Sequence, residues 1–323
     1  MKKEMINTTH IEGLVYDHKL EQKVSGAQSK NPGTTFIAGT LDVATDYAMD
    51  TEGTLTGKGI NIVKIHFTYV TATTAKGNNN ATFQALQKII NEEKTVVKVG
   101  KENAFKVRCD SAIGLNEWFR ELTDEKPQSV VRNEGGFVHI VNSISDAEKD
   151  HNTWKADMVI TGVREVEGDT EKGTEDHAVV RGAIFDFRKA LLPFEFTVRS
   201  KGAINYFLNL DVSNKQPIFT CVWGRQMSTV VKTQTVTESA FGEDEVKITE
   251  RTTREFVCNG ASKVPYEWDD ESTITAAELA QAMSDRELAL ATIKKRQEEY
   301  QASKQAGSAS TVPSGDDTPG YNF

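Results

Sequence analysis

One stretch of the chain decides its fold class: Asn61-Ile62-Val63-Lys64-Ile65-His66-Phe67-Thr68-Tyr69-Val70-Thr71. Apolar and polar side chains alternate through it, so that Val63, Ile65, Phe67 and Tyr69 fall on one face and Lys64, His66 and Thr68 on the other. A period of two is typical of a β-strand with one buried face and one solvated face. The stretch therefore predicts a half-buried strand with a polar outer surface.

Segments of similar character surround this strand in the first half of the chain. Turn residues bound further strand candidates at 10–24, 34–46, 95–99, 104–109 and 137–141. Between them, residues 80–93 carry Phe83, Leu86, Ile89 and Ile90 at helical spacing after Asn80, a good N-cap residue. About five strands with one helix inserted late in their order predict an OB-type barrel.

The second half repeats this plan. Phe36-Ile37-Ala38-Gly39-Thr40-Leu41 is echoed by Met158-Val159-Ile160-Thr161-Gly162-Val163, and Val107-Arg108 followed by Ala112-Ile113 is echoed by Val198-Arg199 followed by Ala203-Ile204. We expect strands at 156–166, 178–187, 192–199 and 217–226, then a long hairpin with arms at 228–237 and 245–258. The second barrel is shorter, as though it lacked the first barrel's helix, and the pairs Trp118-Phe119 and Tyr206-Phe207 after the second echo are typical of barrel plugs.

The remaining chain changes to helix and then to a polar tail. Thr275-Ala276-Ala277-Glu278 is a capping box ahead of Leu279, Met283, Leu290 and Ile293. We expect this helix to pack its first half on the second barrel, with pairing to another copy as the alternative. The predicted fold is mainly β with α: two OB-type barrels at 1–148 and 149–268, a C-terminal helix at 269–304 and a disordered acidic tail at 305–323.

Composition excludes several classes of protein. Three cysteines, Cys109, Cys221 and Cys258, lack C-x-x-C spacing, so we expect buried reduced thiols rather than disulfides or a zinc site. The N-terminus shows no targeting signal, and no run approaches 18 apolar residues, the length of a membrane span. We therefore expect a cytoplasmic protein. The net charge of −9 is concentrated in the acidic segments 238–245 and 267–271 and in the tail, which leaves a body that is closer to neutral.

Signatures of enzymes are absent from the sequence. Gly53-x-x-x-Gly57-Lys58-Gly59 is one residue too short for a phosphate-binding loop and lacks its Ser or Thr. The six histidines form no metal-binding motif. We expect no catalytic activity, no metal and no cofactor. An accessory subunit of a nuclease or ligase would need clustered acids, and Glu243, Asp244 and Glu245 are explained more simply as a solvated turn.

Aromatic and basic residues interleave on several predicted strands, as single-stranded nucleic acid requires. The best stretch is Phe219-x-Cys221-x-Trp223-x-Arg225, which continues toward Lys232. A second set is Lys64, His66 and Arg108, and a third is Arg181, Phe185 and Phe187 with Arg199 and Lys201. For each set the alternative is structural: rings such as Phe219, and one of Phe185 and Phe187, belong to a core, and the cations meet only water.

The last eight residues, Asp316-Asp317-Thr318-Pro319-Gly320-Tyr321-Asn322-Phe323, combine an acidic pair with a terminal aromatic. This tail resembles those of bacterial single-stranded DNA-binding proteins, although Gly320, Tyr321 and Asn322 separate its proline from its phenylalanine. The resemblance implies that Asp316, Asp317 and Phe323 dock a partner protein. The alternative is an ordinary frayed terminus.

With its two barrels, its aromatic and basic strand and this tail, the chain resembles phage-encoded single-stranded DNA-binding proteins of the tandem OB-fold type. The second barrel is similar to the DNA-binding barrels of replication protein A. The resemblance implies coating of exposed strands in phage replication or recombination, with single-stranded DNA and replication proteins as partners. Pairing of the C-terminal helix with another copy would add self-association. A virion or scaffold protein built from β domains is the alternative.

Overall fold

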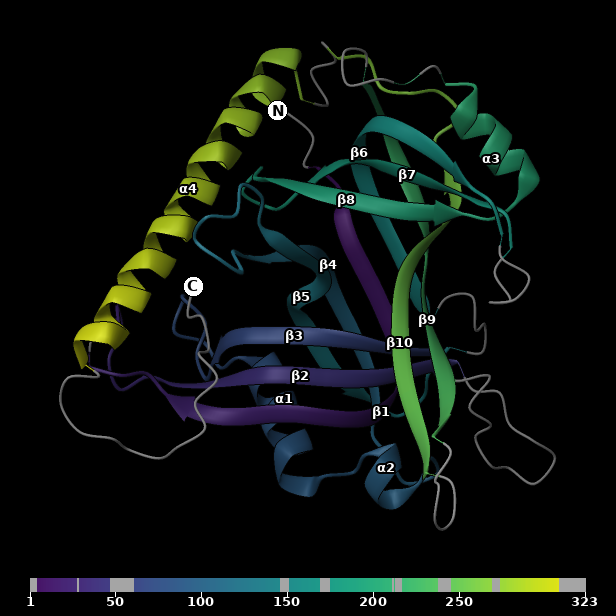
Figure 1. Cartoon of the computed structure of the whole chain (residues 1–323). Coiled ribbons are helices and arrows are strands. Elements are labelled where there is room, and N and C mark those ends of the chain that lie inside the picture. Colours follow the sequence, from purple (N-terminus) through teal and green to yellow (C-terminus); the bar gives the residue numbers. More distant parts are fainter. Residues whose placement is uncertain are drawn as a thin grey trace.

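The computed structural model describes residues 5–27, 29–46, 61–145, 151–168, 175–210, 212, 217–237, 245–268 and 274–307. Its ten strands form one sheet that closes on itself twice, with four helices outside it (Figure 1). The chain is thus mainly β, as its alternating stretches predict.

The first barrel contains β1 (Asn7–Val24), β2 (Thr35–Asp46), β3 (Asn61–Thr71), β4 (Lys106–Trp118) and β5 (Gln128–Val141). Its strands pair in the closed order β1-β2-β3-β5-β4-β1, in which only the β3–β5 pair is parallel. The helices α1 (Ala81–Glu92) and α2 (Val96–Val99) lie between β3 and β4 in the chain. A five-stranded Greek-key barrel is the OB-type architecture that the sequence predicts.

The second barrel repeats this order with β6 (Asn152–Val166), β7 (His177–Phe185), β8 (Leu191–Val198), β9 (Ile218–Thr237) and β10 (Glu245–Ala261). Its strands pair as β6-β7-β8-β10-β9-β6, again with a single parallel pair, β8–β10. The expected absence of a helix is wrong, because α3 (Lys201–Leu208) occupies the place that corresponds to α1. Its two buried side chains are Ile204 and Phe207. Ile204 belongs to the repeated motif that ends in Ala203-Ile204, and Phe207 belongs to the pair Tyr206-Phe207 that the sequence predicted to plug the barrel.

Each barrel has its own hydrophobic core. In the first, Ile11, Ile65 and Val107 pack against Phe83, Leu86 and Ile89 of α1. In the second, Trp154 lies among Phe194, Phe196 and Phe256. The pairing of β1 with β6 joins the two barrels. The predicted boundary at 148–149 falls between β5 and β6, and it stays a prediction.

Two short segments show how local capping decides a helix. Asn80 accepts hydrogen bonds from the backbone N–H groups of Thr82 and Phe83 and so begins α1, as predicted. The strand expected at 95–99 is wrong. Thr95 Oγ1 accepts a bond from the N–H of Lys98, and this cap begins the single turn of α2 in spite of three β-branched valines.

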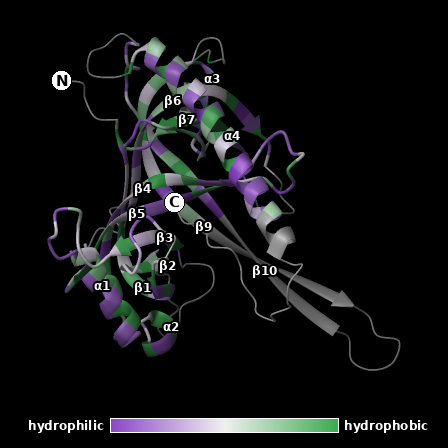
Figure 2. Cartoon of the chain, turned by 90° about the vertical axis from the view of Figure 1, so that its left-hand side faces the viewer, coloured by the Kyte–Doolittle hydropathy of each residue, from purple (hydrophilic) through white to green (hydrophobic). Residues whose placement is uncertain are grey.

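The helix α4 (Ala276–Gly307) lies along both barrels (Figure 1). The predicted capping box is present, because the N–H of Thr275 donates to Glu278 Oε2 at 2.8 Å and the N–H of Glu278 donates to Thr275 Oγ1 at 3.3 Å. Leu279 packs on a small core of Val159, Phe185, Phe219 and Ile274, and this confirms the expected packing of the first half of the helix. Figure 2 shows hydrophilic and hydrophobic residues interspersed along α4.

All three cysteines are buried and free, as predicted. Among the described residues, no helix is both long enough and apolar enough to cross a membrane.

Candidate nucleic-acid interface

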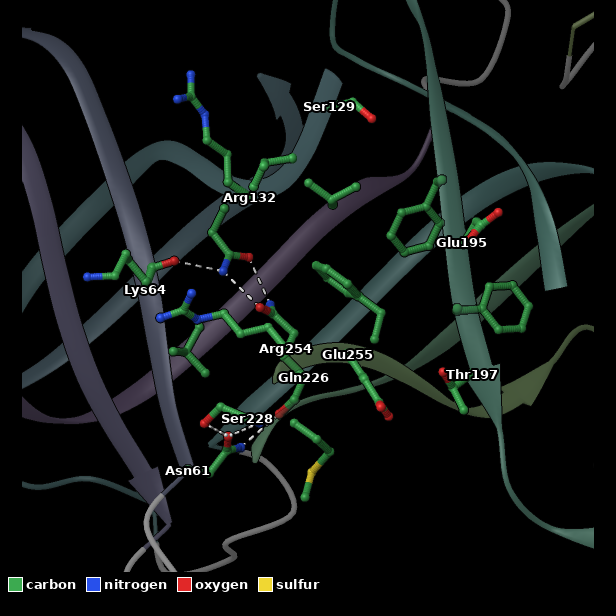
Figure 3. Close-up of a pocket in the computed structure, with 18 of the residues that line it drawn as sticks. Asn61, Lys64, Ser129, Arg132, Glu195, Thr197, Gln226, Ser228, Arg254 and Glu255 are labelled. Carbon is green, nitrogen blue, oxygen red and sulfur yellow. Dashed lines mark hydrogen bonds between the residues drawn. The ribbon is translucent and has the colours of Figure 1, made fainter. Parts of the chain in front are cut away.

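A groove of about 690 Å³ lies where the two barrels meet. The first barrel lines it with β3 and β5, and the second with β8, β9 and β10 (Figure 3). In each barrel the third and fifth strands therefore face the groove, because β8 and β10 correspond to β3 and β5. Val130 and Met227, which are 50% and 39% exposed, offer apolar surface within it.

Three cations enter this groove from three different strands: Lys64 on β3, Arg132 on β5 and Arg254 on β10. Lys64 Nζ lies 2.6 Å from Asp42 Oδ1, and Arg132 Nη2 lies 2.5 Å from Glu134 Oε1. Arg254 is exposed, and Figure 3 shows it on the same side of the groove as Lys64. A polyanion in the groove would meet positive charge from both barrels.

His66 lies among these cations. Burial lowers its pKa to about 4, and the positive charges of Arg132, Lys64 and Arg254 act in the same direction. The imidazole is therefore neutral at pH 7, and it contributes hydrogen-bonding atoms rather than charge.

Two carboxylates, Glu195 and Glu255, line the part of the groove that belongs to the second barrel. Glu195 and Thr197 lie on β8, across the groove from Lys64 (Figure 3). Glu255 is paired with Arg199 at 2.6 Å, so that Arg199 lies at the edge of the groove rather than inside it. The groove is therefore mixed in charge: among the described residues, three cations and two carboxylates line it, and Asp42 and Glu134 pair with two of the cations.

Buried amide side chains hold the walls of the groove together. Gln226 on β9 and Asn133 on β5 exchange two hydrogen bonds of 2.8 Å between their side chains. Asn152 accepts from the N–H of Gln226 and donates to its carbonyl, and Asn61 donates to the same carbonyl at 2.7 Å. We call these four residues the amide seam. The seam joins β3 and β5 of the first barrel to β6 and β9 of the second, so it fixes the backbone of strands on both sides of the groove.

Trp223, Arg225 and Arg108, three of the predicted residues, lie elsewhere. Trp223 and Arg225 occupy the face of β9 opposite to Gln226, because successive side chains of a strand alternate. The Trp223 ring is 39% exposed and covers Gly260, where a Cβ would approach it to 2.6 Å. Arg108 on β4 is paired with buried Glu12 at 3.0 Å.

The structure corrects the prediction for Phe185. Its ring is 1% exposed, and it packs in the core beneath α4 with Val159 and Phe219. Because β7 ends at Phe185, the following turn directs the next ring outward. Phe187 is that ring, and it is 87% exposed. Phe219 is also a core residue, with 1% exposure.

Arg181 and Lys201 are exposed on β7 and α3, and neither lines the groove. Lys232 lies on β9 opposite Glu250, and its side chain is outside the part of the chain that the structure describes. The tail residues Asp316, Asp317 and Phe323 are also outside the described residues.

Of the residues predicted from the sequence, Lys64 and His66 line the groove. The prediction did not include Arg132, Arg254 or the amide seam. Arg132 belongs to a part of β5 that begins nine residues before the predicted strand at 137. Arg254 lies within the predicted hairpin arm, where the alternation Arg254-x-Phe256 was a usable signal. Among the described residues, no cluster of His, Cys, Asp and Glu is placed to hold a metal ion.

Comparison with known proteins gives one family and one solved structure to report. A family model described as YorF matches residues 6–296. No curated protein matches the chain. A crystal structure of a deletion mutant of the single-stranded DNA binding protein from Thermus aquaticus is similar at 11% identity and a TM-score of 0.44, covering 83% of this chain and 99% of that chain.

Proposed function

The chain belongs to the YorF family, and we propose that it binds single-stranded DNA without sequence preference through the groove between its barrels. The observation that carries this proposal is the placement of Lys64, Arg132 and Arg254, which come from both barrels and line one groove whose strands are joined by the amide seam and by the pairing of β10 with β9. OB-type barrels bind oligonucleotides on the face of their second and third strands, and the third strand of each barrel, β3 and β8, lines this groove.

The chemistry of the groove suits the backbone of a nucleic acid. Cations that contact phosphates carry no sequence information, so binding should be independent of sequence. The partly exposed Val130 and Met227 can cover the apolar faces of unpaired bases, which a duplex keeps stacked in its interior. Single strands should therefore bind more tightly than duplex.

The biological setting of this proposal rests on the sequence alone. We propose that the protein coats exposed strands during replication or recombination of phage DNA, in the cytoplasm of a bacterial host. Its acidic tail, with Asp316, Asp317 and Phe323, would dock a replication protein. The role is one of binding rather than catalysis.

Titration of a fluorescent oligo-dT over a range of salt concentrations tests the central proposal. Three phosphate contacts predict a slope of about −2 in a plot of log affinity against log salt, since each contact to a single strand contributes about −0.7. The same protein should bind a duplex of equal length more weakly. No binding at low salt, or equal affinity for both forms, would refute the proposal.

A pair of variants tests the groove itself. Arg254→Ala should weaken binding and make the slope shallower by about 0.7, because one phosphate contact is lost. Lys295→Ala is the matched control, since Lys295 is 76% exposed on α4, away from the groove. If both variants changed the slope equally, the effect would be one of overall charge, and the groove would not be the binding site.

A further inference from the structure

A second pocket, of about 370 Å³, follows the groove along the same two strands. The groove is lined by 61–66 of β3 and 129–133 of β5, and this pocket by 67–71 and 135–137 of the same strands. The two strands run parallel, and their pairing ends at Ile65–Asn133 and His66–Glu134. The pocket opens where they separate, beside Asn80 and Thr82 at the start of α1.

Two glycines on β5 shape this opening. Gly135 and Gly136 have φ angles of +62° and +101°, a region that side chains rarely adopt. A Cβ on Gly136 would also lie 1.9 Å from the carbonyl oxygen of Asp110. The register of β5 against β4 shifts at the same place, between Asp110 and Ala112. This irregularity leaves Phe137 at the mouth of the pocket with 69% of its surface exposed.

An aromatic ring also stands on the β3 side. Tyr69 is 39% exposed, and its ring centroid lies 4.5 Å from that of buried Phe36, which holds it in place. The polar groups between the rings are largely occupied: Asn80 caps α1, Thr82 Oγ1 accepts from the N–H of Val138, and Thr71 Oγ1 donates to the carbonyl of Thr73. The pocket therefore offers aromatic surface rather than charge.

We propose that this pocket is a base-stacking subsite, which takes one unpaired nucleobase of a strand whose phosphates lie in the groove. The inference rests on the proposed function and adds the place where a base is held. Its occupant follows from continuity with the groove, because Tyr69 lies three residues beyond His66 on β3, about 10 Å along the strand. Strict alternation would place these two side chains on opposite faces, but the register of β3 against β2 shifts between Phe67 and Val70, and Val70 rather than Tyr69 packs against the first core. A strand that leaves the cations of the groove meets these rings next. Stacking does not discriminate between bases, so the subsite keeps binding independent of sequence.

Phe137→Ala tests the subsite, with Phe187→Ala as the matched control, because Phe187 is a still more exposed phenylalanine on the β7–β8 turn. Phe137→Ala should weaken binding of oligo-dT by about 5- to 150-fold, the usual value of one stacked base. Phe187→Ala should remain within about twofold of the unmodified protein. A fully abasic oligomer of the same length should bind both variants and the unmodified protein equally, since it has phosphates but no bases.

Phe137→Leu separates loss of the ring from unfolding of the protein, because leucine retains apolar bulk and lacks the aromatic ring. It should lose affinity for oligo-dT and keep the melting temperature of the unmodified protein. Unchanged oligo-dT affinity in both Phe137 variants would overturn the subsite while leaving the groove proposal intact, as would an equal loss on the abasic oligomer. If the unmodified protein binds no single strand at low salt, the proposed function fails, and the subsite fails with it.

Discussion

The pKa of His66 responds to the positive charges that line the groove. Burial and three neighbouring cations lower its pKa from 6.5 to about 4 in the folded protein. Between these two values the unfolded chain binds the proton and the folded chain does not, so the free energy of unfolding falls as the pH falls from about 6.5 to about 4. Above pH 6.5 the residue costs nothing in either state.

His66→Gln should remove this dependence. The shift in pKa corresponds to roughly 3 kcal/mol of lost stability at the acid end of the window. Urea unfolding at several pH values should therefore show a shallower decline for the variant between pH 6.5 and pH 4 than for the unmodified protein. Parallel declines would mean that His66 is solvated and that the three cations do not converge on it.

The aromatic residues show where reasoning from single residues stops. Phe185 and Phe187 are two positions apart, so a continuous strand would place both on one face. The strand ends at Phe185, and Asp186 Oδ1 then accepts from the N–H groups of Arg188 and Ala190 to form the turn. One ring enters the core and the other enters solvent. No alternation pattern contains that information, because the end of the strand sets it.

At the scale of elements, α4 connects the two barrels. Arg286 donates to the carbonyl of Leu191 on β8 at 3.2 Å and pairs with Glu117 on β4 at 2.5 Å. Further along the helix, Gln297 exchanges hydrogen bonds with the backbone of Phe119, which is buried beneath it. The helix therefore braces both barrels from the side.

Arg286→Ala should destabilise the protein by about 3 kcal/mol, because it leaves the carboxylate of Glu117 buried without its partner. The side chain of Glu117 is only 9% exposed. Arg296→Ala, on an exposed part of the same helix, should stay within about 0.5 kcal/mol of the unmodified protein. Unfolding in urea compares the two. Equal stability of both variants would show that α4 contributes little to holding the barrels.

Much at this scale was predictable from the sequence. Period-two alternation predicts the strands, and the capping residues Asn80 and Thr275 predict where two helices begin. The errors occur in short elements. Residues 96–99 and 201–208 are too brief for periodicity to distinguish a helix from a strand or a plug, so contacts across the fold decide their structure.

The groove was less predictable than the elements that form it. Lys64 and Arg254 are 190 positions apart in the chain, and they line one groove because the two barrels pair through β1 and β6 and are joined by the amide seam. Alternation identified Lys64 and His66 as outward-facing, yet Arg108 satisfies the same pattern and faces a carboxylate elsewhere. Sequence shows which residues point outward from a barrel, and only the assembly shows which outward surfaces face one another.

At the scale of the whole molecule, a protein with a net charge of −9 is proposed to bind a polyanion. The distribution of the charges over the chain explains how both can hold. Acidic residues concentrate in 238–245, in 267–271 and at Asp316 and Asp317, whereas Lys64, Arg132 and Arg254 converge in one groove. Because salt screens exposed charges beyond about 10 Å at 0.1 M, the local field decides binding, and the acidic segments weaken it mainly at low salt.

Truncation after Ser314 tests this balance, because it removes the two negative charges of Asp316 and Asp317 together with the ring of Phe323, while the new C-terminus keeps a carboxylate. Negative charges tethered to the protein compete with DNA for the same cations, and screening suppresses that competition. The truncated protein should therefore bind oligo-dT as tightly as the full chain or more tightly at low salt, and any difference should vanish as salt is raised. A matched full-length variant, Asp316→Asn with Asp317→Asn, separates charge from length and should reproduce most of the gain. If truncation instead abolished DNA affinity, the tail would belong to the binding surface, and the groove would be incomplete without it.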